Sequence, residues 1–299
     1  MAIEFRHELE VSYGTLEEVS PLVRRIVAKN PGPFTYTGTG TYVIGRGKVA
    51  VIDAGPKKPE HIEALLSALE GEEITHQLVT HTHNDHSPGA ALVKERTGAR
   101  TYGFGAHGEG RYERGAKVEA GADHEFRPDE AMGHGDVLLG DGWSIECVHT
   151  PGHCSNHLCF QLIEEKALFS GDHVMGWSTS IVSPPDGDMA SYMASLDLLL
   201  ERDDLRYYPT HGPVIEEPKP FVRSFIEHRK QREAQIVDCL QRGVEHIAQM
   251  VEEMYRELPR PMHGAAARSV LAHMLHLMEL GRVRAEGEPG VGTRFMLTP

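Results

Sequence analysis

Cysteine is scarce in this 299-residue chain: its four cysteines form neither a C-x-x-C pair nor a dense pattern. This excludes a disulfide-stapled scaffold, and free thiols are typical of a reducing compartment. No run of about 18 apolar residues occurs, so we expect no membrane-spanning helix. The first residues, MAIEFRHELEVSYG, lack an apolar stretch. We therefore expect no secretory leader and a cytoplasmic protein.

An excess of positive charge is also missing. The net charge is −14, with 30 Lys and Arg against 44 Asp and Glu. An acidic chain repels phosphate, which disfavours a long nucleic acid as the default partner. The sequence contains no G-x-S-x-G motif, so we expect no serine nucleophile of the α/β-hydrolase type.

Strands and helices alternate in the first part of the chain. Residues 41–55 predict a β-hairpin, and residues 74–80 predict a buried strand. Apolar residues at helical spacing, closed by a glycine, predict helices over 59–71 and 87–98. Alternation of this kind indicates a layered α/β domain.

More strands follow in the middle of the chain. Residues 143–153 predict a strand that ends in a Pro-Gly turn, and residues 156–162 and 166–172 predict a strand pair. A helix is expected over 189–204, then a short strand and loop over 206–215.

The composition changes near residue 220. Residues 1–220 contain 19 Lys and Arg against 34 Asp and Glu, whereas residues 221–299 contain 11 against 10. Two long helices, over 220–243 and 265–283, and a hairpin over 283–297 are expected beyond this point. We therefore predict two domains, residues 1–220 and 221–299.

Histidine is abundant, at 19 residues, and it clusters. The stretch VTHTHNDHSPGAAL follows a predicted strand and brings four possible metal ligands into six positions: His81, His83, Asp85 and His86. Three similar groups come at the ends of later predicted strands: His153, Asp172 and His211. Because the ends of strands can aim loop residues at one point, we expect all seven to converge.

Imidazole and carboxylate ligands suit zinc, and also manganese or iron. The seven side chains divide into two groups of three and one shared group: His81, His83 and His153; Asp85, His86 and His211; and Asp172, which could bridge. Two divalent cations about 3.5–4 Å apart can hold a hydroxide between them. The sequence thus predicts a dinuclear hydrolytic centre, in which Asp85 or water handles the proton.

The motifs THTHNDH, HTPGH, FSGD and PTHGP resemble, in this order, the ligand motifs of the metallo-β-lactamase superfamily. The resemblance covers residues 1–220 and implies an α/β fold, an αββα sandwich with the metals at one edge. Residues 221–299 resemble the small helical, winged-helix-like domain of the lactamase-like endoribonuclease branch and its bacterial relatives. TPGHCSNHLCF and SGDHVMGWSTSIVSPPDGDM also resemble that branch.

The resemblance guides the choice among neighbouring residues. His153 matches the family's ligand position after the Pro-Gly turn, whereas His149 is expected at the strand end. Asp53 either caps a turn or supports a ligand by hydrogen bonding, and the resemblance favours support. His157 could hydrogen-bond to a ligand or belong to the core. Cys154 is expected to be a small buried hydrophobe.

Candidate residues for a substrate cleft are aromatic. Tyr36, Phe34 and Trp177 are expected in loops that could line a cleft, although isolated aromatics more often belong to the core. His173 follows Asp172 and could reach the cleft or pack against the sheet.

Several functions are compatible with such a centre. The favoured hypothesis is a metal-dependent hydrolase that uses a metal-bound hydroxide on a small ester, thioester or lactone. The alternative is a metal-dependent phosphodiesterase or endoribonuclease, which the acidic charge disfavours. A β-lactamase is less favoured because no export signal is visible, and a non-enzymatic nucleic-acid-binding regulator is less favoured because the ligand set is intact.

The C-terminal part is expected to dock and to shape the substrate site. Its 11 Lys and Arg are interleaved with 10 Asp and Glu and form no long basic stripe, so a nucleic-acid reader is disfavoured. Its apolar helix faces could pack on the catalytic domain or on a second copy of the chain, as in a homodimer.

Overall fold

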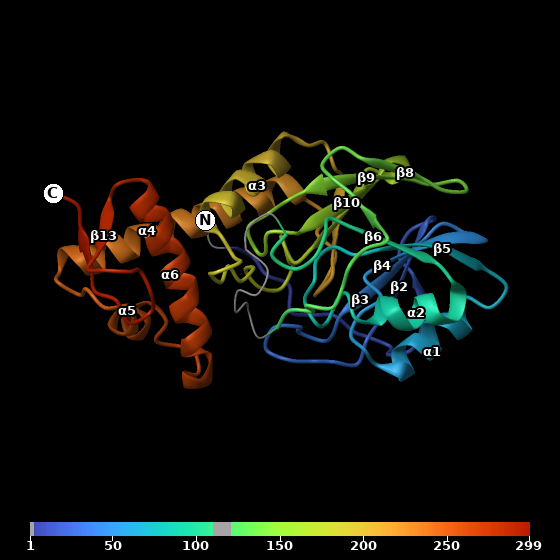
Figure 1. Cartoon of the computed structure of the whole chain (residues 1–299), viewed down its shortest axis with the longest axis horizontal. Helices are drawn as coiled ribbons and strands as arrows, with labels where there is room; N and C mark the ends of the chain where they lie inside the picture. Colours follow the sequence, from blue (N-terminus) through green and yellow to red (C-terminus); the bar gives the residue numbers. More distant parts are fainter. Residues whose placement is uncertain (1–2, 110–120) are drawn as a thin grey trace.

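Two β-sheets lie face to face, and helices cover the outer face of each sheet (Figure 1). The computed structural model describes residues 3–109 and 121–299. In these residues the first sheet has seven strands in sequence order. They are β1 (Glu17–Glu18), β2 (Val23–Val27), β3 (Gly40–Ile44), β4 (Lys48–Ile52), β5 (Glu73–Leu78), β6 (Arg100–Gly103) and β7 (Glu130–Ala131). The first four strands are antiparallel, and β4 to β7 are parallel.

The second sheet has five described strands in the order β12-β11-β10-β9-β8. They are β8 (Val137–Leu139), β9 (Ser144–His149), β10 (Leu158–Leu162), β11 (Ala167–Gly171) and β12 (Arg206–Pro209). β11 and β12 are parallel, whereas the other pairs are antiparallel. A 3-10 turn, η1 (Ile163–Glu165), joins β10 to β11.

Helices α1 (Pro59–Ala68) and α2 (Gly89–Thr97) cover the first sheet, and α3 (Met189–Glu201) covers the second (Figure 1). Alternation along the strands explains this layering. In β4, Val49 and Val51 belong to the core under α1 and α2, whereas Ala50 and Ile52 belong to the core between the sheets. The expected αββα sandwich is confirmed.

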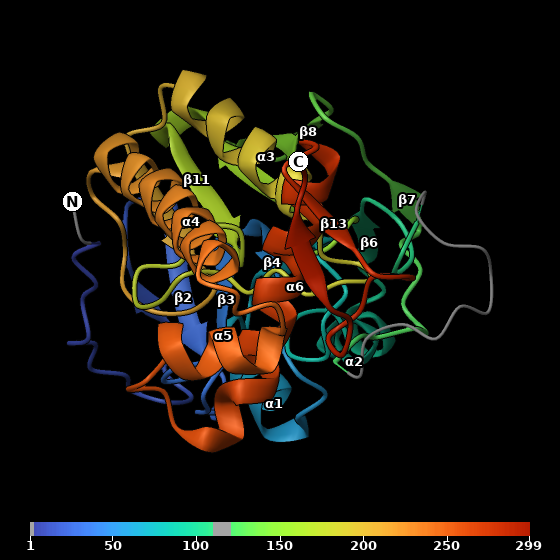
Figure 2. The same ribbon diagram turned by 90° about the vertical axis from the view of Figure 1, so that its left-hand side faces the viewer.

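Beyond the sandwich, α4 (Pro218–Gln241) leads into a smaller unit. This unit contains α5 (Ile247–Met254), η2 (Arg260–Met262), α6 (His263–Glu279) and the hairpin β13 (Val283–Ala285) and β14 (Phe295–Leu297). These elements gather at one end of the sandwich (Figure 1), and Figure 2 looks at the molecule from that end. The two long helices and the hairpin match the sequence-based expectation, whereas α5 was not expected.

Helix α4 belongs to both parts of the molecule. Phe225, in its first half, lies in the core of the sandwich with α3, and Leu240, in its second half, lies in the core of the C-terminal unit. The predicted boundary at residue 220 therefore lies in the first turn of a continuous helix. None of the helices in the described ranges is both long and apolar enough to span a bilayer.

Candidate metal centre

Histidine and carboxylate side chains from separate loops converge at one edge of the two sheets. The loop after β5 carries His81, His83, Asp85 and His86. His153 lies between β9 and β10, Asp172 follows β11, and His211 follows β12. All seven predicted ligands therefore come from loops that the sheets hold in place.

The first predicted group contains three imidazoles in contact. His83 Nδ1 lies 3.0 Å from His81 Nε2 and 3.0 Å from His153 Nε2. The nitrogen lone pairs repel one another at this distance unless a proton or a cation lies between them. The three rings thus offer a site for a positively charged ligand.

The second predicted group is equally close. His211 Nε2 lies 3.1 Å and His86 Nε2 lies 3.4 Å from the same oxygen, Asp85 Oδ2. Asp172 lies between the two groups. Its Oδ1 is 3.4 Å from His211 Nε2, and its Oδ2 is 3.6 Å from His86 Nε2 and 3.8 Å from His153 Nε2.

The residues present fit a cation. His86 Nε2, His211 Nε2 and Asp172 Oδ1 are buried and, apart from the ion-pair contacts given above, form no hydrogen bond with the described residues. Leaving such atoms unsatisfied costs free energy, whereas a divalent metal would satisfy all three. Within the described ranges, three combinations of side chains could hold an ion: His81, His86 and Asp172; Asp85, His86 and His211; and His81, His153 and Cys154. Cys154 also contacts Asn156, with Sγ 3.4 Å from Oδ1.

The second ring nitrogen of several histidines is anchored. His211 Nδ1 lies 3.0 Å from the carbonyl oxygen of Gly38, and His153 Nδ1 lies 2.5 Å from that of Ile181. A carbonyl only accepts, so each Nδ1 carries the proton and donates it. This tautomer leaves the Nε2 lone pair to face the centre.

Asp53 anchors the loop after β5. One of its oxygens accepts the Thr80 backbone N–H at 2.8 Å, and the other accepts the Thr80 hydroxyl at 2.7 Å and His86 Nδ1 at 2.8 Å. Thr210 Oγ1 also lies 3.3 Å from Asp53 Oδ2. Asp53 adopts φ +50°, a strained backbone conformation. Its carboxylate hydrogen-bonds to the loop that carries the first four predicted ligands. These hydrogen bonds are those expected of a residue that supports a ligand.

His157 is hydrogen-bonded to the backbone of Asp172. Its Nε2 accepts the Asp172 backbone N–H at 3.2 Å, and its Nδ1 lies 2.9 Å from Thr150 Oγ1. Gly171 makes this contact possible: it has φ +51°, and a Cβ there would lie 2.5 Å from His157 Nε2. His157 is thus both fully buried and hydrogen-bonded to the backbone of Asp172, and its role as a support for a ligand stays a prediction.

The charges in the centre are strongly coupled. Burial and the neighbouring imidazoles lower the pKa of His81 well below its usual value. Burial also disfavours the charged form of His86, but Asp85 and Asp172 outweigh it and raise the pKa of His86 well above normal. Burial likewise disfavours the charged form of His211, but Asp172 and Asp85 outweigh it and raise the pKa of His211. In the absence of metal, protons therefore supply part of the positive charge that the carboxylates need.

The predicted cleft residues lie at different depths. The rings of Tyr36 and Trp177 stack with centroids 5.0 Å apart, and Trp177 lines a pocket together with Phe34. His173 is fully buried, and its ring centroid lies 4.8 Å from that of Tyr192. His149 is outside the centre, with its ring stacked on Phe104.

Sequence reasoning missed the threonines and the asparagine that hold the histidines. Thr80 Oγ1 lies 3.0 Å from His81 Nδ1, and Thr82 Oγ1 accepts a hydrogen bond from Asn156 Nδ2 at 2.9 Å. His107 Nδ1 lies 2.9 Å from the same Thr82 oxygen. The alternation T-H-T-H was a signal for the threonines, because alternate residues of an extended segment face opposite sides. Nothing in the local pattern indicated Asn156 or His107.

Two family models match the chain. The model described as Metallo-beta-lactamase superfamily matches residues 37–211, and the model described as Beta-lactamase associated winged helix domain matches residues 247–292. The first range contains all seven converging side chains. The second lies within the C-terminal unit.

Individual proteins match over most of the chain. The Lactamase-like protein adaB of Aspergillus niger is 32% identical over 307 residues, covering 95% of this chain and 89% of that protein. The Atrochrysone carboxyl ACP thioesterase of Claviceps purpurea is 32% identical over 257 residues, covering 81% and 74%. The crystal structure of a Beta-lactamase domain protein from Burkholderia ambifaria, 21% identical, has a TM-score of 0.78 and covers 99% and 97% of the two chains. This last likeness concerns the fold.

Proposed function

We propose a thioesterase activity for this chain, which belongs to the metallo-beta-lactamase superfamily and is one of its metal-dependent hydrolases. The proposed hydrolysis takes place at a dinuclear metal centre. The reaction adds water to the carbonyl carbon, breaks the C–S bond and releases a carboxylic acid and a thiol. The relative named as an acyl-carrier thioesterase, 32% identical over 81% of this chain, supports thioesters over other small esters and lactones.

The main support for a centre with two metal ions is the position of Asp172 between the two predicted ligand groups. Its two carboxylate oxygens face different histidines, with Oδ1 3.4 Å from His211 Nε2 and Oδ2 3.8 Å from His153 Nε2. A carboxylate with this arrangement suits a bridge between two cations. His81, His83 and His153 would hold one ion, and Asp85, His86 and His211 the other. Zinc suits this donor set best.

Two divalent ions bound there would lower the pKa of a water molecule and polarise the substrate carbonyl. The residues of the chain hold these groups in place and move the proton. The Asp85 side chain is 26% exposed, against 10% for Asp172, so Asp85 is the carboxylate that solvent and substrate reach more easily. We assign Asp85 the role of taking a proton from the attacking water and passing it to the leaving thiolate.

A substrate panel tests the proposal. The zinc-loaded chain is assayed with acyl thioesters, lactones, a β-lactam, a phosphodiester and RNA under one set of conditions. We expect the highest kcat/KM for a thioester and a drop of at least about 100-fold in Asp85→Ala, with an unchanged unfolding transition. Cleavage of RNA or of the phosphodiester without thioester hydrolysis would overturn the proposal.

A further inference from the structure

A pocket of about 180 Å³ lies between the sandwich and the C-terminal unit. The sandwich contributes Phe34 and the segment 175–181, which includes Trp177. The other side comes from α4, the segment after α5 and the region of η2 and α6, including Arg232 and Tyr255. Because both parts of the chain form its walls, the pocket exists only when the C-terminal unit is docked.

One wall of the pocket adjoins the metal centre. Ile181 lines the pocket, and its carbonyl oxygen lies 2.5 Å from Nδ1 of His153. Trp177 packs closely on the residue after His211, since a Cβ on Gly212 would lie 2.9 Å from Trp177 Cδ1. The segment that forms this wall thus contacts His153 of one group and Gly212, the residue next to His211 of the other.

The pocket carries positive charge that no carboxylate neutralises. Arg229 is 2% exposed and donates to the carbonyl oxygen of Ser180, with its guanidinium 5.0 Å from the ring of Tyr192. Arg232 lies 4.5 Å from the ring of Tyr255 and donates to carbonyl and amide oxygens. Among the described residues neither arginine pairs with an Asp or Glu. An arginine that is buried without a carboxylate, as Arg229 is, costs free energy, and an anion bound beside the partly buried Arg232 would lower this cost.

Residues of the pocket wall also hold donors without partners. Trp177 Nε1 and Arg229 Nε, which can only donate, have no hydrogen-bond partner in the part of the chain that the structure describes. His228 Nε2 accepts from Arg232 at 3.3 Å, so the proton of the neutral ring is on Nδ1, which also has no partner there. Burial and the two arginines lower the pKa of His228 to about 3, which keeps the ring neutral. These three donors are buried behind the lining, so what the wall offers a ligand with acceptor oxygens is the partly buried guanidinium of Arg232.

The size and lining of the pocket indicate a ligand that contains an aromatic ring. A dry cavity of roughly 150 Å³ can hold benzene, so this pocket has room for one ring or a small fused pair. Phe34, Trp177 and Tyr255 contribute aromatic side chains to the lining, and Met262 contributes an apolar one.

We propose that this pocket binds the acyl part of the substrate, an aromatic group that carries an anionic oxygen. The inference rests on the proposed thioesterase function and narrows its substrate class. The ring lies against Trp177 and Tyr255, and Arg232 pairs with the anionic oxygen. The C-terminal unit thereby sets acyl specificity without contributing a side chain to the reaction.

Ligand binding tests the pocket separately from catalysis. The full-length chain, zinc-loaded and after metal removal, is titrated calorimetrically with 2-naphthoate and with its neutral counterpart 2-naphthamide. We expect the acid to bind at least tenfold more tightly in both states, and Arg232→Met to abolish the difference. Arg223→Met, an exposed arginine on the same helix outside the pocket, should keep it.

Equal affinities for acid and amide, or loss of acid binding on metal removal, would overturn the inference. Kinetics give the second measurement: Arg232→Met should lower kcat/KM for a 6-carboxy-2-naphthoyl thioester at least tenfold more than for the 2-naphthoyl thioester. Arginine-dependent binding without thioester hydrolysis would refute the proposed function and retain the pocket. Thioester hydrolysis with no preference for aromatic or anionic acyl groups would refute the role of the pocket and retain the proposed function.

Discussion

At the scale of single residues, Asp53 shows how a buried carboxylate supports the centre. It is fully buried and accepts hydrogen bonds from the Thr80 backbone, the Thr80 hydroxyl and His86. These contacts fix the direction in which the His86 ring presents Nε2 to the centre. A carboxylate in this position also raises the basicity of its imidazole partner.

Replacing Asp53 with Asn keeps the size of the side chain and tolerates φ +50°. It removes the charge and sets an amide N–H₂ against donors, so we expect zinc affinity to fall roughly 10–100-fold. Competition with a chromophoric chelator measures this change. Asp141→Asn, in an exposed turn, is the control. Unchanged zinc affinity in Asp53→Asn would refute the supporting role.

The raised pKa values of His86 and His211 make metal binding depend on pH. Burial disfavours both imidazolium ions, but Asp85 and Asp172 stabilise them in the metal-free chain. A metal ion at these nitrogens must displace their protons, so zinc affinity at this site should rise with pH. The rise should approach about tenfold per pH unit for each proton released and level off above the raised pKa values. Chelator competition between pH 6 and 9 measures the slope, and a flat profile would contradict the prediction.

The seven converging residues could be predicted from the sequence because each follows a strand, and the family resemblance separated His153 from His149. Contacts that join distant loops could not be predicted. Asn156 reaches Thr82 across 74 positions of the chain, and its own neighbours in sequence give no sign of that contact.

At the scale of elements, the α4–α6 contact joins α6 of the C-terminal unit to the helix that both parts of the molecule share. Glu233 of α4 lies 2.7 Å from His276 Nδ1 and 3.3 Å from His273 Nδ1, both on α6. Burial opposes the charge of Glu233, yet the two histidines lower its pKa to about 2. The same carboxylate raises the pKa of His276, whereas burial lowers that of His273.

Glu233→Gln should therefore destabilise the chain by about 1–2 kcal/mol near pH 6. The contribution of Glu233, whose folded pKa is lowered, is present above its ordinary value of 4.5 and is lost as the pH falls toward 2. The contribution of His276, whose pKa is raised, is present below 6.5 and is lost as the pH rises through the raised value. Urea unfolding at several pH values measures both limbs. Glu227→Gln, exposed on the same helix, should have little effect, and equal effects of the two variants would contradict this account.

Elements with a clear period could be predicted, and elements without one could not. The helix over 59–68 and the strand over 167–171 follow their patterns, whereas β2 has the sequence VRRIV and no alternation. Helix α5 is only eight residues long. Its apolar residues Ile247, Met250 and Val251 have helical spacing, but a segment of this length is too short to establish a helical period from the sequence.

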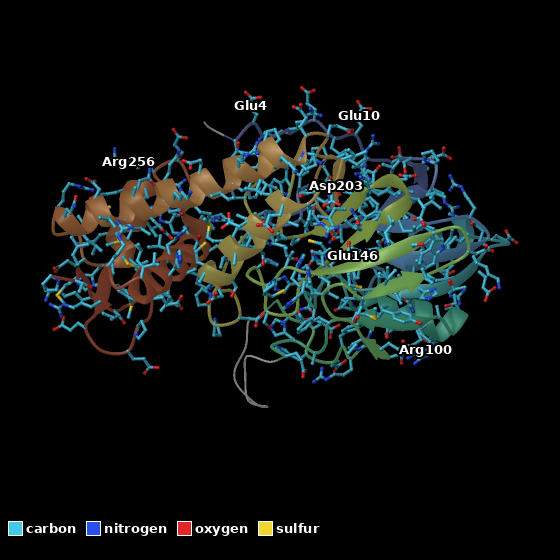
Figure 3. All side chains as sticks on the ribbon, turned by 90° about the horizontal axis from the view of Figure 1, so that it is seen from above. Glu4, Glu10, Arg100, Glu146, Asp203 and Arg256 are labelled. Atoms are coloured by element: carbon cyan, nitrogen blue, oxygen red, sulfur yellow. The ribbon has the colours of Figure 1, made fainter. Side chains whose placement is uncertain are left out.

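At the scale of the whole molecule, the two parts are joined by a shared helix. Val222, Phe225 and Ile226 of α4 complete the core over the second sheet. The acidic residues Glu146 and Asp203 lie over the sandwich, whereas Arg256 lies on the C-terminal unit (Figure 3). Arg100 also lies on the sandwich, so the acidic excess of residues 1–220 is a difference in net charge between the two parts of the sequence.

The shared helix predicts how the chain tolerates truncation. A chain that ends at residue 220 loses three buried side chains and should be less stable than one that ends at residue 232 by roughly 5 kcal/mol. Urea unfolding of the two truncated chains measures the difference. Equal stabilities would show that the domain boundary lies at residue 220 and that α4 adds nothing to the sandwich.

Zinc titration of the metal-free chain tests the central claim most directly, with bound zinc and hydrolysis of a 2-naphthoyl thioester followed in the same samples. The account predicts saturation at two ions per chain and activity that reaches its maximum with the second ion. Saturation at one ion, or full thioester hydrolysis by the metal-free chain, would contradict it.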